Sequence, residues 1–503
     1  MQAIFDDGPW PPCPAPFNLA AHVLARARDV PDKVALAVVS DTQADRWTYA
    51  RLQAAVLGTA TGLLRAGFAP GDILLMRLGN TVDFPVAYLG AIAAGIVPVP
   101  TSSQLTAPEV AKMLVDLKPA GILRAPDVAC PDTALPVIDT AALAAMRDLA
   151  PAAYAMGDPD RLAYIIYTSG TSGASRAVMH AHRAIWARGM MHRDWYGLTA
   201  DDRLCHAGAF NWTFTLGTGL MDPWSVGATA LIPAAGTDPA ALPRLLHRHD
   251  ATIFAAAPGV YRKLLTGAPL DLPCLRHGLA AGEKLSDRIR AGWEAATGRP
   301  IYEAFGMSEC STFISGGPDA PAHPGTLGRP QRGRKVAILF EDGQPAAIGD
   351  DGVIAVHRTD PGLMLGYFGQ SAETAARYAG DWFLTGDRGV MDAGGHVSYT
   401  GRADDMMNAG GFRVSPLEVE AALHDFPGLR EVGVTDVTVK DDAAIIAAFY
   451  VADHDLDPAA LAAWAEARLA RYKQPRAWVR LPALPHNANG KLSRRALKPL
   501  FSR

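Results

Sequence analysis

Apolar positions along the chain alternate between helical spacing and short continuous runs. Helical spacing is clear over 49–67 (YARLQAAVLGTATGLLRAG), a short apolar run follows over 72–78 (DILLMRL), and helical spacing returns over 84–95. The same order recurs later, with helices expected over 182–192, 238–248 and 258–266 and strands over 228–233 and 251–257. This alternation predicts α/β layers built on mostly parallel sheets.

The pattern changes in the last third of the chain. Residues 325–400 contain short β runs with glycine-rich turns (KVAILF, GVIAVH, HVSYT), which are typical of a small β barrel or sandwich. After Gly401, a helix over 415–426, two strands (EVGVTDVTV, AIIAAFYV) and a helix over 458–471 predict a compact α+β unit. The expected fold class is therefore α/β and α+β. Residues 1–401 would form a large domain of two α/β subdomains plus a small β barrel, and residues 402–503 a small mobile α+β domain.

Composition narrows the class of protein. The 503 residues are 49% hydrophobic and 19% charged, which indicates a globular chain, and a net charge of −4 with dispersed Lys and Arg argues against nucleic-acid binding. The N-terminus lacks the pattern of a secretory signal, and the longest apolar stretch, 84–100, is broken by Gly and Pro. Five cysteines show no CxxC spacing. We expect a soluble cytoplasmic protein with reduced thiols and no membrane span.

The stretch 167–180 (YTSGTSGASRAVMH) leaves an apolar run through many hydroxyls and glycines. Glycines let backbone N–H groups approach an anion, and Ser and Thr add short donors, so a phosphate site is one interpretation. A plain surface loop is the other, and the stretch alone does not decide between them. The spacing GxxxxGK[ST] is missing, which excludes a Walker P-loop.

Three further segments carry candidate chemistry. Ser308 and Glu309 follow an apolar strand in IYEAFGMSECSTF, where a hydroxyl and a carboxylate could hold phosphate and Mg²⁺. Asp387 follows a Thr-Gly turn in WFLTGDRG and could accept hydrogen bonds from ribose. Lys491 follows Asn489-Gly490 in PHNANGKLSRRALK. Singly, each segment could equally be an ordinary turn or a solvated charge.

Together and in this order, the four segments resemble the adenylate-forming enzymes, which include acyl- and aryl-CoA synthetases, firefly luciferase and peptide-synthetase adenylation domains. The resemblance runs from WTYARLQ, GFAPGDILLMRLGN and YLGAIAAGIVPVP to NGKLSRRALK. It implies a two-step ligase that uses ATP, Mg²⁺ and coenzyme A. A carboxylate attacks the α-phosphate of ATP to give an acyl-adenylate and pyrophosphate, and a thiol then displaces AMP. Positioning and charge neutralisation would dominate catalysis, since the attacking group and ATP are both anions.

The resemblance also implies roles for individual residues. The β- and γ-phosphates would be wrapped by Thr168, Ser169, Gly170, Thr171, Ser172 and Gly173. Ser308 would contact the α-phosphate, Glu309 would hold Mg²⁺, and Lys491 would bridge the carboxylate and the α-phosphate. Adenine would stack on Phe305 beside Gly306, Gly282 and Glu283, and ribose would bind Asp387 and Arg402.

One position departs from the family pattern. The loop usually continues Gly-x-Pro-Lys-Gly, whereas this chain has Gly173-Ala174-Ser175-Arg176-Ala177. Arg176 keeps the charge but not the geometry of an ammonium, so we expect altered handling of ATP without loss of activity.

The second step implies a rotation of the C-terminal domain in this family. Asp404 would be the hinge, and Gly410-Gly411 would line the pantetheine tunnel, although a glycine pair is also an ordinary hairpin turn. Arg413 is a candidate contact to phosphate or to the C-terminal domain.

The acid pocket in this family is built from the segment after the strand expected over 201–210, the AAGE strand and the region after Glu309, here residues 310–315. The first of these reads FNWT from Phe210 and lacks the Asp that pairs with the ammonium of an amino acid. Acetate enzymes place a Trp at the position of Gly306, so a glycine there predicts a pocket open to a larger acid. Trp212, Phe214, Ala281, Met307 and Phe313 would form an apolar wall for a medium-chain or aromatic acid, though each could equally pack in the core.

Three functions remain open. The favoured one is an acyl- or aryl-CoA synthetase, acting on a small-molecule acid as a monomer or homodimer. The second is a stand-alone adenylation enzyme that loads a separate carrier protein. The third is a nucleotide-binding relative that has lost catalysis, which only Arg176 suggests.

Overall fold

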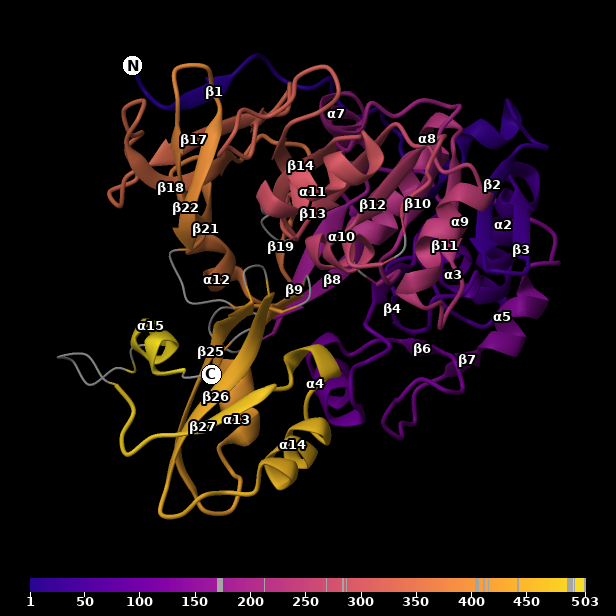
Figure 1. Cartoon of the computed structure of the whole chain (residues 1–503). Helices are drawn as coiled ribbons and strands as arrows, with labels where there is room; N and C mark the ends of the chain where they lie inside the picture. The colour runs from indigo at the N-terminus through magenta and orange to yellow at the C-terminus, as the bar shows by residue number, and fades with distance from the viewer. Residues whose placement is uncertain are drawn as a thin grey trace.

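A computed structural model of the chain describes residues 1–169, 175–211, 213–267, 269–282, 285, 287–402, 407–409, 412–414, 416–440, 443–485, 492 and 494–501. Three regions follow one another along the sequence and are visible in Figure 1. Two α/β layers occupy residues up to about β15, a six-stranded antiparallel sheet follows, and an α+β part ends the chain. The α/β alternation expected from the sequence is confirmed.

The larger α/β layer is a nine-stranded sheet. Its order is β16-β15-β14-β13-β12-β10-β11-β2-β3, and the strands from β14 to β2 are parallel while the edges are antiparallel. The strands are β2 (Val34–Val39), β3 (Ala44–Thr48), β10 (Arg203–His206), β11 (Thr229–Pro233), β12 (Ile253–Ala256), β13 (His277–Ala281), β14 (Ile301–Met307), β15 (Ser311–Ser315) and β16 (Arg329–Pro330). The parallel strands are almost wholly buried, as a sheet covered on both faces requires.

Helices from both halves of the sequence cover this sheet. On one side of the molecule lie α1 (Leu19–Val23), α2 (Tyr49–Arg65), α3 (Asp83–Ala93), α5 (Thr140–Met146) and α8 (Asp222–Val226). The second set is α9 (Leu242–Arg248), α10 (Pro258–Leu265) and α11 (Asp287–Thr297). The largest core cluster packs around α2 and α3, and its members include Leu52, Val56, Tyr88 and Trp224.

The smaller α/β layer is a four-stranded parallel sheet. Its order is β5-β4-β6-β7, formed by Val97–Pro100, Ile73–Arg77, Gly121–Arg124 and Val137–Asp139, with α4 (Ala107–Leu117) packed beside it. A separate hairpin, β8 (Leu162–Ser169) and β9 (Ser175–Ala181), runs alongside β5 and pairs with β19 (Gly366–Tyr367). This hairpin therefore joins the small sheet to the later part of the chain.

Three expected helices differ in detail from the structure. The helix expected over 458–471 ends at Glu466. The segment expected over 182–192 is broken into α6 (Ala184–Ala187), α7 (Gly189–Met191) and a π-helical turn, His192–Tyr196, which buries both Trp195 and Tyr196. The helix expected over 238–248 begins as a 3₁₀ turn, Pro239–Ala241, before α9. The reason for the second break is that Pro243 has no N–H to continue the helical ladder across the junction.

The six-stranded sheet accounts for the change of pattern after residue 325. Its order is β1-β17-β18-β21-β20, with β22 paired to β21. The strands are β1 (Ile4–Asp6), β17 (Lys335–Leu339), β18 (Asp351–His357), β20 (Tyr378–Ala379), β21 (Trp382–Met391) and β22 (Val397–Arg402), and α12 (Ser371–Ala375) lies before β20. Strand β1 brings the N-terminus to this sheet, as Figure 1 shows.

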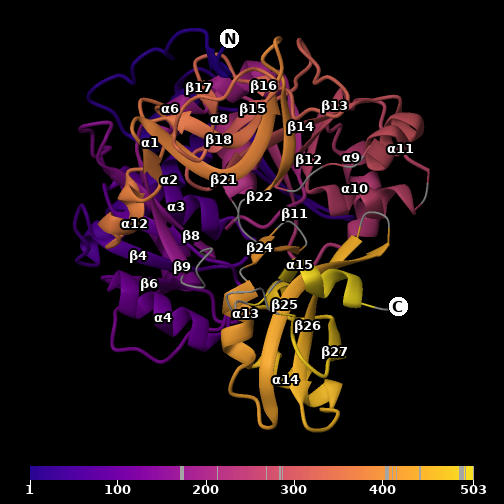
Figure 2. The same cartoon turned by 90° about the vertical axis from the view of Figure 1, so that its left-hand side faces the viewer.

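The C-terminal part is α+β, as expected. Strands β23 (Met407–Ala409) and β24 (Phe412–Val414) form a hairpin, and β25 (Leu429–Lys440), β26 (Ala443–Ala452) and β27 (Ala477–Arg480) form a three-stranded sheet. The helices are α13 (Pro416–Leu423), α14 (Pro458–Glu466) and α15 (Arg494–Leu497). Figures 1 and 2 both show α4 beside α13, so the C-terminal part rests against the small α/β layer.

Among the described residues, no helix combines the length and the apolar character needed to span a membrane.

Candidate functional site

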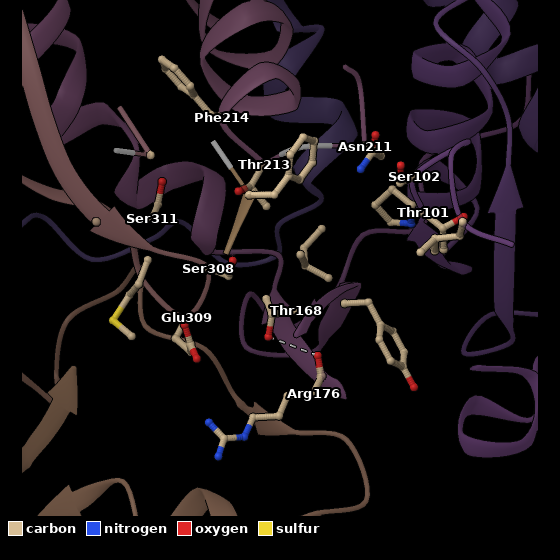
Figure 3. Close-up of a pocket in the computed structure, with 18 of the residues that line it drawn as sticks. Thr101, Ser102, Thr168, Arg176, Asn211, Thr213, Phe214, Ser308, Glu309 and Ser311 are labelled. Atoms are coloured by element: carbon tan, nitrogen blue, oxygen red, sulfur yellow. Dashed lines mark hydrogen bonds between the residues drawn. The ribbon is translucent and has the colours of Figure 1, made fainter. Parts of the chain in front are cut away.

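A cavity of about 550 Å³ lies where the regions of the molecule meet. It opens beyond the carboxyl ends of the parallel strands β13 and β14, which is where ligands bind in open α/β sheets. Residues of β5 and α4, the β8–β9 hairpin, the segment after β10, the β14–β15 turn and the C-terminal part line it. Figure 3 shows labelled side chains from the segment after β5, the β8–β9 hairpin, the segment after β10 and the β14–β15 turn around one space.

Thr168 and Arg176 come from the two strands of the β8–β9 hairpin. They pair across the hairpin, and Thr168 Oγ1 donates a hydrogen bond to the carbonyl oxygen of Arg176 at 3.5 Å (Figure 3). Arg176 thus lies within β9 rather than in the loop between the strands. Both residues line the cavity. The side chains of Ser169 and residues 170–174, expected to wrap phosphates, lie outside the described residues.

A chain of contacts links Arg176 to Glu309. Arg176 is 6% exposed, and its guanidinium pairs with Glu373 of α12 and lies 5.1 Å from the centre of the Tyr367 ring. The Tyr367 hydroxyl donates a hydrogen bond to Glu309 Oε1 at 2.8 Å. Burial raises the pKa of Tyr367, and the nearby Glu309 carboxylate raises it further. The tyrosine therefore stays protonated and holds the carboxylate in one orientation.

Glu309 fits the role of a magnesium ligand. It is buried and lines the cavity, and Mg²⁺ in nucleotide sites is held by one or two carboxylates together with phosphate oxygens. Among the described residues, no cluster of three or more Asp, Glu, His or Cys side chains could hold a metal by protein ligands alone.

The ends of β13 and β14 supply other expected residues. Ala281, Gly282, Gly306, Met307 and Ser308 all line the cavity. A side chain at Gly306 would place its Cβ 2.2 Å from the carbonyl oxygen of Ser311, so glycine allows β15 to approach β14 at this point. The Cβ direction at 306 thus leads toward the backbone of β15. Glu283, the neighbour of Gly282, lies outside the described residues.

Three expected residues with described side chains, Phe305, Phe313 and Asp387, lie outside the cavity lining. Phe305 packs edge-on against Phe313 at 5.4 Å and near Tyr399 at 6.0 Å, and Phe313 is completely buried in the adjacent core. Asp387 is buried in β21, where it accepts a hydrogen bond from the Tyr399 hydroxyl at 3.3 Å. The strand register places Asp387 opposite Arg402, whose side chain is outside the described residues.

The structure adds residues that the sequence did not indicate. Arg188 lines the inner end of the cavity beside Ser311 of the expected 310–315 segment, Thr101 and Ser102 line it after β5, and Glu109 and Met113 line it from α4. No local motif marks them, because they come from separate elements that only the fold brings together.

The C-terminal part contributes Phe412, Glu418, Tyr472 and Lys473 to the cavity lining. Phe412 stacks on Tyr472 with ring centres 4.1 Å apart, and β24 lies beside β8. Phe412 directly follows Gly410 and Gly411, the expected tunnel residues, which lie outside the described residues. Lys491, Asp404 and Trp212 also lie outside them, as does the side chain of Arg413. Phe214 lines the cavity and stacks on Trp195.

The chain belongs to the AMP-binding enzyme family. Residues 23–368 match the family of AMP-binding enzymes, and residues 418–491 match the AMP-binding enzyme C-terminal domain. The sequence is 30% identical over 461 residues to the benzoate–CoA ligase of Thauera aromatica, covering 86% of each chain. It is 29% identical over 485 residues to the 3-hydroxybenzoate–CoA ligase of an Aromatoleum strain, covering 90% of this chain and 91% of that one.

A solved structure has the same fold over almost the whole length. It is the o-succinylbenzoate CoA synthetase of Bacillus subtilis, a double mutant bound with a product analogue. The TM-score is 0.84 at 24% identity, covering 95% of this chain and 98% of that chain.

Proposed function

We propose that this protein is an AMP-forming acid–CoA ligase that activates an aromatic or medium-chain carboxylic acid. The observation that carries the proposal is the cavity at the ends of β8, β13 and β14, where Thr168, Ser308 and Glu309 converge. The family supports it, because relatives along 86% or more of this chain are named as benzoate and hydroxybenzoate ligases. The substrates are the acid, ATP and coenzyme A, with Mg²⁺ as cofactor.

In the first step, a carboxylate oxygen of the acid bonds to the α-phosphorus of ATP, and the bond to pyrophosphate breaks. Two unit charges 4 Å apart repel by about 1 kcal/mol in water and by several times more in a protein site, so the site must offset this repulsion. Mg²⁺ supplies positive charge between the phosphates when bound. Thr168 and the Ser308 hydroxyl are placed to donate hydrogen bonds to phosphate oxygens, and Tyr367 keeps Glu309 turned toward the cavity.

In the second step, the thiol of coenzyme A adds to the acyl carbonyl and AMP leaves. Phe412, Tyr472 and Lys473 line the cavity on the side of the C-terminal part, which supports delivery of the thiol from that side. We propose that residues 402–503 act as a mobile domain hinged at Asp404, on a body of residues 1–401 in which the six-stranded sheet serves as the small barrel. Gly410 and Gly411 would line the thiol path in this arrangement.

The remaining assignments follow the family resemblance. Residues 169–173 would close on the β- and γ-phosphates, Arg176 would act at their edge, and Lys491 would bridge the acid and the α-phosphate. Phe305, Gly282 and Glu283 would hold adenine, Asp387 and Arg402 would hold ribose, and Arg413 would contact phosphate. The acid would lie against Trp212, Phe214, Ala281 and Met307, whereas Phe313, expected in the same wall, packs in the core behind the cavity. We place the enzyme in the cytoplasm as a monomer or homodimer.

The test is pyrophosphate release with ATP and Mg²⁺ across a panel of acids, with and without coenzyme A. The panel includes acetate, octanoate, benzoate, 3-hydroxybenzoate, cinnamate and several amino acids. We expect release with one aromatic or medium-chain class, together with a thioester product that requires coenzyme A. Release without any thioester would point to a carrier protein as acceptor. No release with any acid would contradict the ligase, provided that circular dichroism shows folded protein.

A further inference from the structure

The inner end of the cavity is closed by a buried ion pair. Arg188 Nε lies 2.8 Å from Asp222 Oδ1, and Arg188 Nη2 lies 2.6 Å from Asp222 Oδ2. Arg188 is 7% exposed and Asp222 is fully buried. The Tyr196 hydroxyl also donates a hydrogen bond to Asp222 Oδ2 at 2.8 Å. A charged pair placed here carries a desolvation cost that an apolar pair would avoid, so its presence calls for a reason.

A small chamber with a mainly apolar lining and a few polar side chains adjoins the cavity at this ion pair. It measures about 30 Å³, enough for a water molecule or one polar substituent, and it shares Arg188, Thr213, Met307, Ser308 and Ser311 with the main cavity. In the view of Figure 3, Ser308 lies between Ser311 on one side and Thr168 and Arg176 on the other. Ser308, the expected α-phosphate contact, therefore lies at the near edge of the chamber, and the Arg188 and Ser311 side lies farther from Thr168 and Arg176.

Two buried polar side chains lining this chamber lack good hydrogen bonds. Tyr88 is 0% exposed, and its hydroxyl has no partner among the described residues. His180 is 3% exposed, and neither ring nitrogen makes a hydrogen bond of good geometry within the described part of the chain, although the Ser308 backbone lies close. Buried polar groups are nearly always paired, so unpaired ones at a cavity point to a ligand group that pairs with them.

One N–H group of the Arg188 guanidinium has no hydrogen-bond acceptor among the described residues. Its Nε and Nη2 groups bond to Asp222, with Thr218 and Tyr196 also near Nη2, and Nη1 donates to Ser311 Oγ at 2.5 Å. A guanidinium has five N–H groups. Within the described residues, these contacts leave the second N–H of Nη1 without a partner at the surface of the cavity.

The net charge around Arg188 determines which kind of substrate substituent can occupy the chamber. The Arg188 cation is already matched by the Asp222 carboxylate, whose Oδ1 also lies 3.6 Å from His192 Nε2. The Thr218, Tyr196 and Ser311 side chains around Arg188 are neutral. A second carboxylate on the ligand would lose its hydration without meeting a net positive charge. A neutral acceptor such as a hydroxyl or carbonyl oxygen can instead take hydrogen bonds from Arg188 and Tyr88.

We propose that the chamber formed by Arg188, Ser311 and Tyr88 selects a monocarboxylic acid that carries a hydroxyl or carbonyl group at the end remote from its carboxylate. This inference rests on the ligase function proposed above. It adds a group of polar residues that would determine substrate specificity to an acid pocket that the sequence predicted to be apolar.

The first experiment compares kcat/KM for acids that differ by one group. The pairs are benzoate with 3- and 4-hydroxybenzoate, octanoate with 8-hydroxyoctanoate, and 4-hydroxybenzoate with terephthalate. We expect a hydroxylated acid to exceed its parent by about tenfold or more, because a hydrogen bond to a charged donor is lost with the parent. Terephthalate should be the poorer of its pair. Equal values within each hydroxylated pair, or a preference for the dicarboxylate, would overturn the inference and leave the ligase standing.

The second experiment ties the preference to the chamber. Tyr88→Phe removes an unpaired hydroxyl and Ser311→Ala removes the acceptor that orients Arg188, so each should lower the ratio of the two kcat/KM values several-fold. Tyr49→Phe is the control, because Tyr49 is equally buried but bonds to the Ala228 carbonyl at 2.6 Å outside the cavity. Ratios that stay at the wild-type value in both chamber variants would contradict the assignment. A shift in the Tyr49 variant of equal size would do the same.

Discussion

Arg176 is the residue at which this chain departs most clearly from its family. Its guanidinium is buried between Glu373 and the Tyr367 ring, and the Tyr367 hydroxyl holds Glu309. A planar guanidinium can stack on a ring and pair with a carboxylate at the same time, which an ammonium does less well. Arg176 lines the cavity itself, and it also helps to position Glu309, the candidate magnesium ligand, because it packs on the Tyr367 ring.

We expect Arg176→Lys to raise the KM for ATP by about threefold or more, because Tyr367 would lose the group that fixes its ring. The measurement is initial-rate pyrophosphate release at varied ATP. The control is Arg358→Lys, since Arg358 also pairs with an acid, Asp381, and lies 5.2 Å from the centre of the Tyr378 ring, but is half exposed. Unchanged KM and kcat in Arg176→Lys would refute this account.

The stability of the folded protein depends on the neutral form of the His182 side chain. It is 1% exposed, and its Nδ1 accepts a hydrogen bond from the Leu19 backbone N–H at 3.0 Å. Burial lowers the pKa of His182 to about 3. The unfolded chain binds a proton near pH 6.5 whereas the folded one does not, so stability falls as the pH drops from about 6.5 toward 3.

His182→Asn keeps an acceptor for the Leu19 N–H and removes the titration. We expect its free energy of unfolding, measured in urea between pH 7 and pH 5, to fall less steeply than that of the wild type. The difference in slope should approach about 1.4 kcal/mol per pH unit below pH 6. Parallel slopes for the two proteins would show that His182 does not contribute.

Among the elements, the β14–β15 hairpin decides the shape of the site. Its two strands carry Gly306, Met307 and Ser311 along the cavity, with Ser308 and Glu309 in the turn. The pairing is irregular between Phe305 and Gly306, where the strands come very close. The sequence interpretation of Gly306 was an open acid pocket, and the structure adds that the glycine is needed for this close approach.

Gly306→Ala should destabilise the protein and impair all acids alike, because the new Cβ meets the backbone of Ser311 and Thr312. Overpacking of this kind costs on the order of 1–3 kcal/mol. Thermal unfolding and kcat/KM for two acids of different size test this. Gly259→Ala in α10 is the control, since its nearest neighbour is the Arg262 side chain at 3.7 Å, and it should be neutral or slightly stabilising. A change in acid preference without loss of stability would favour the pocket interpretation alone.

On the scale of the whole molecule, a buried ionic cluster joins the C-terminal part to the rest. Lys473 Nζ lies 2.7 Å from Glu418 Oε1 and 3.2 Å from Glu109 Oε1 of α4. Burial opposes the charge, but Tyr472 and the two carboxylates raise the pKa of Lys473 above its usual range. Ala470 and Tyr472 also pack against the apolar face of α4, which includes Val110 and Met113. These contacts stabilise the arrangement in which Phe412 lines the cavity.

Glu109→Gln removes one charge from this cluster while keeping the cap of α4, because Gln can replace Glu three residues after the Thr106 cap. If the C-terminal part moves as proposed, thioester formation should slow by up to about tenfold while adenylate formation is spared. Single-turnover rates of the two steps, measured separately, test this. Asp455→Asn is the control, since its pair with Arg480 is exposed and lies within the C-terminal part. Equal slowing of both steps would contradict a role in domain placement.

The sequence by itself determined the secondary structure order and the class of chemistry. Helical spacing in α2 and α3 and apolar runs in β4, β11 and β12 are local properties of neighbouring residues, so the pattern predicts them directly. The motifs around Thr168, Ser308 and Asp387 could be read for the same reason, since each sits in one continuous segment. The prediction of continuous helices over 182–192 and 238–248 was wrong. The first helix is interrupted where side chains are packed into the core, and the second is interrupted at a proline, although the apolar spacing continues in both.

Only the tertiary structure decided which residues share the cavity. Arg188, Asp222 and Ser311 are far apart in the sequence, and Glu109 and Lys473 are separated by 364 positions, so no local spacing connects them. The sequence predicted an apolar wall for the acid pocket, because the aromatic residues lie near recognisable motifs. It could not predict the buried charge of Arg188, which a different element brings to the pocket. Contacts between distant segments depend on how the layers stack, and that is set by packing over the whole chain.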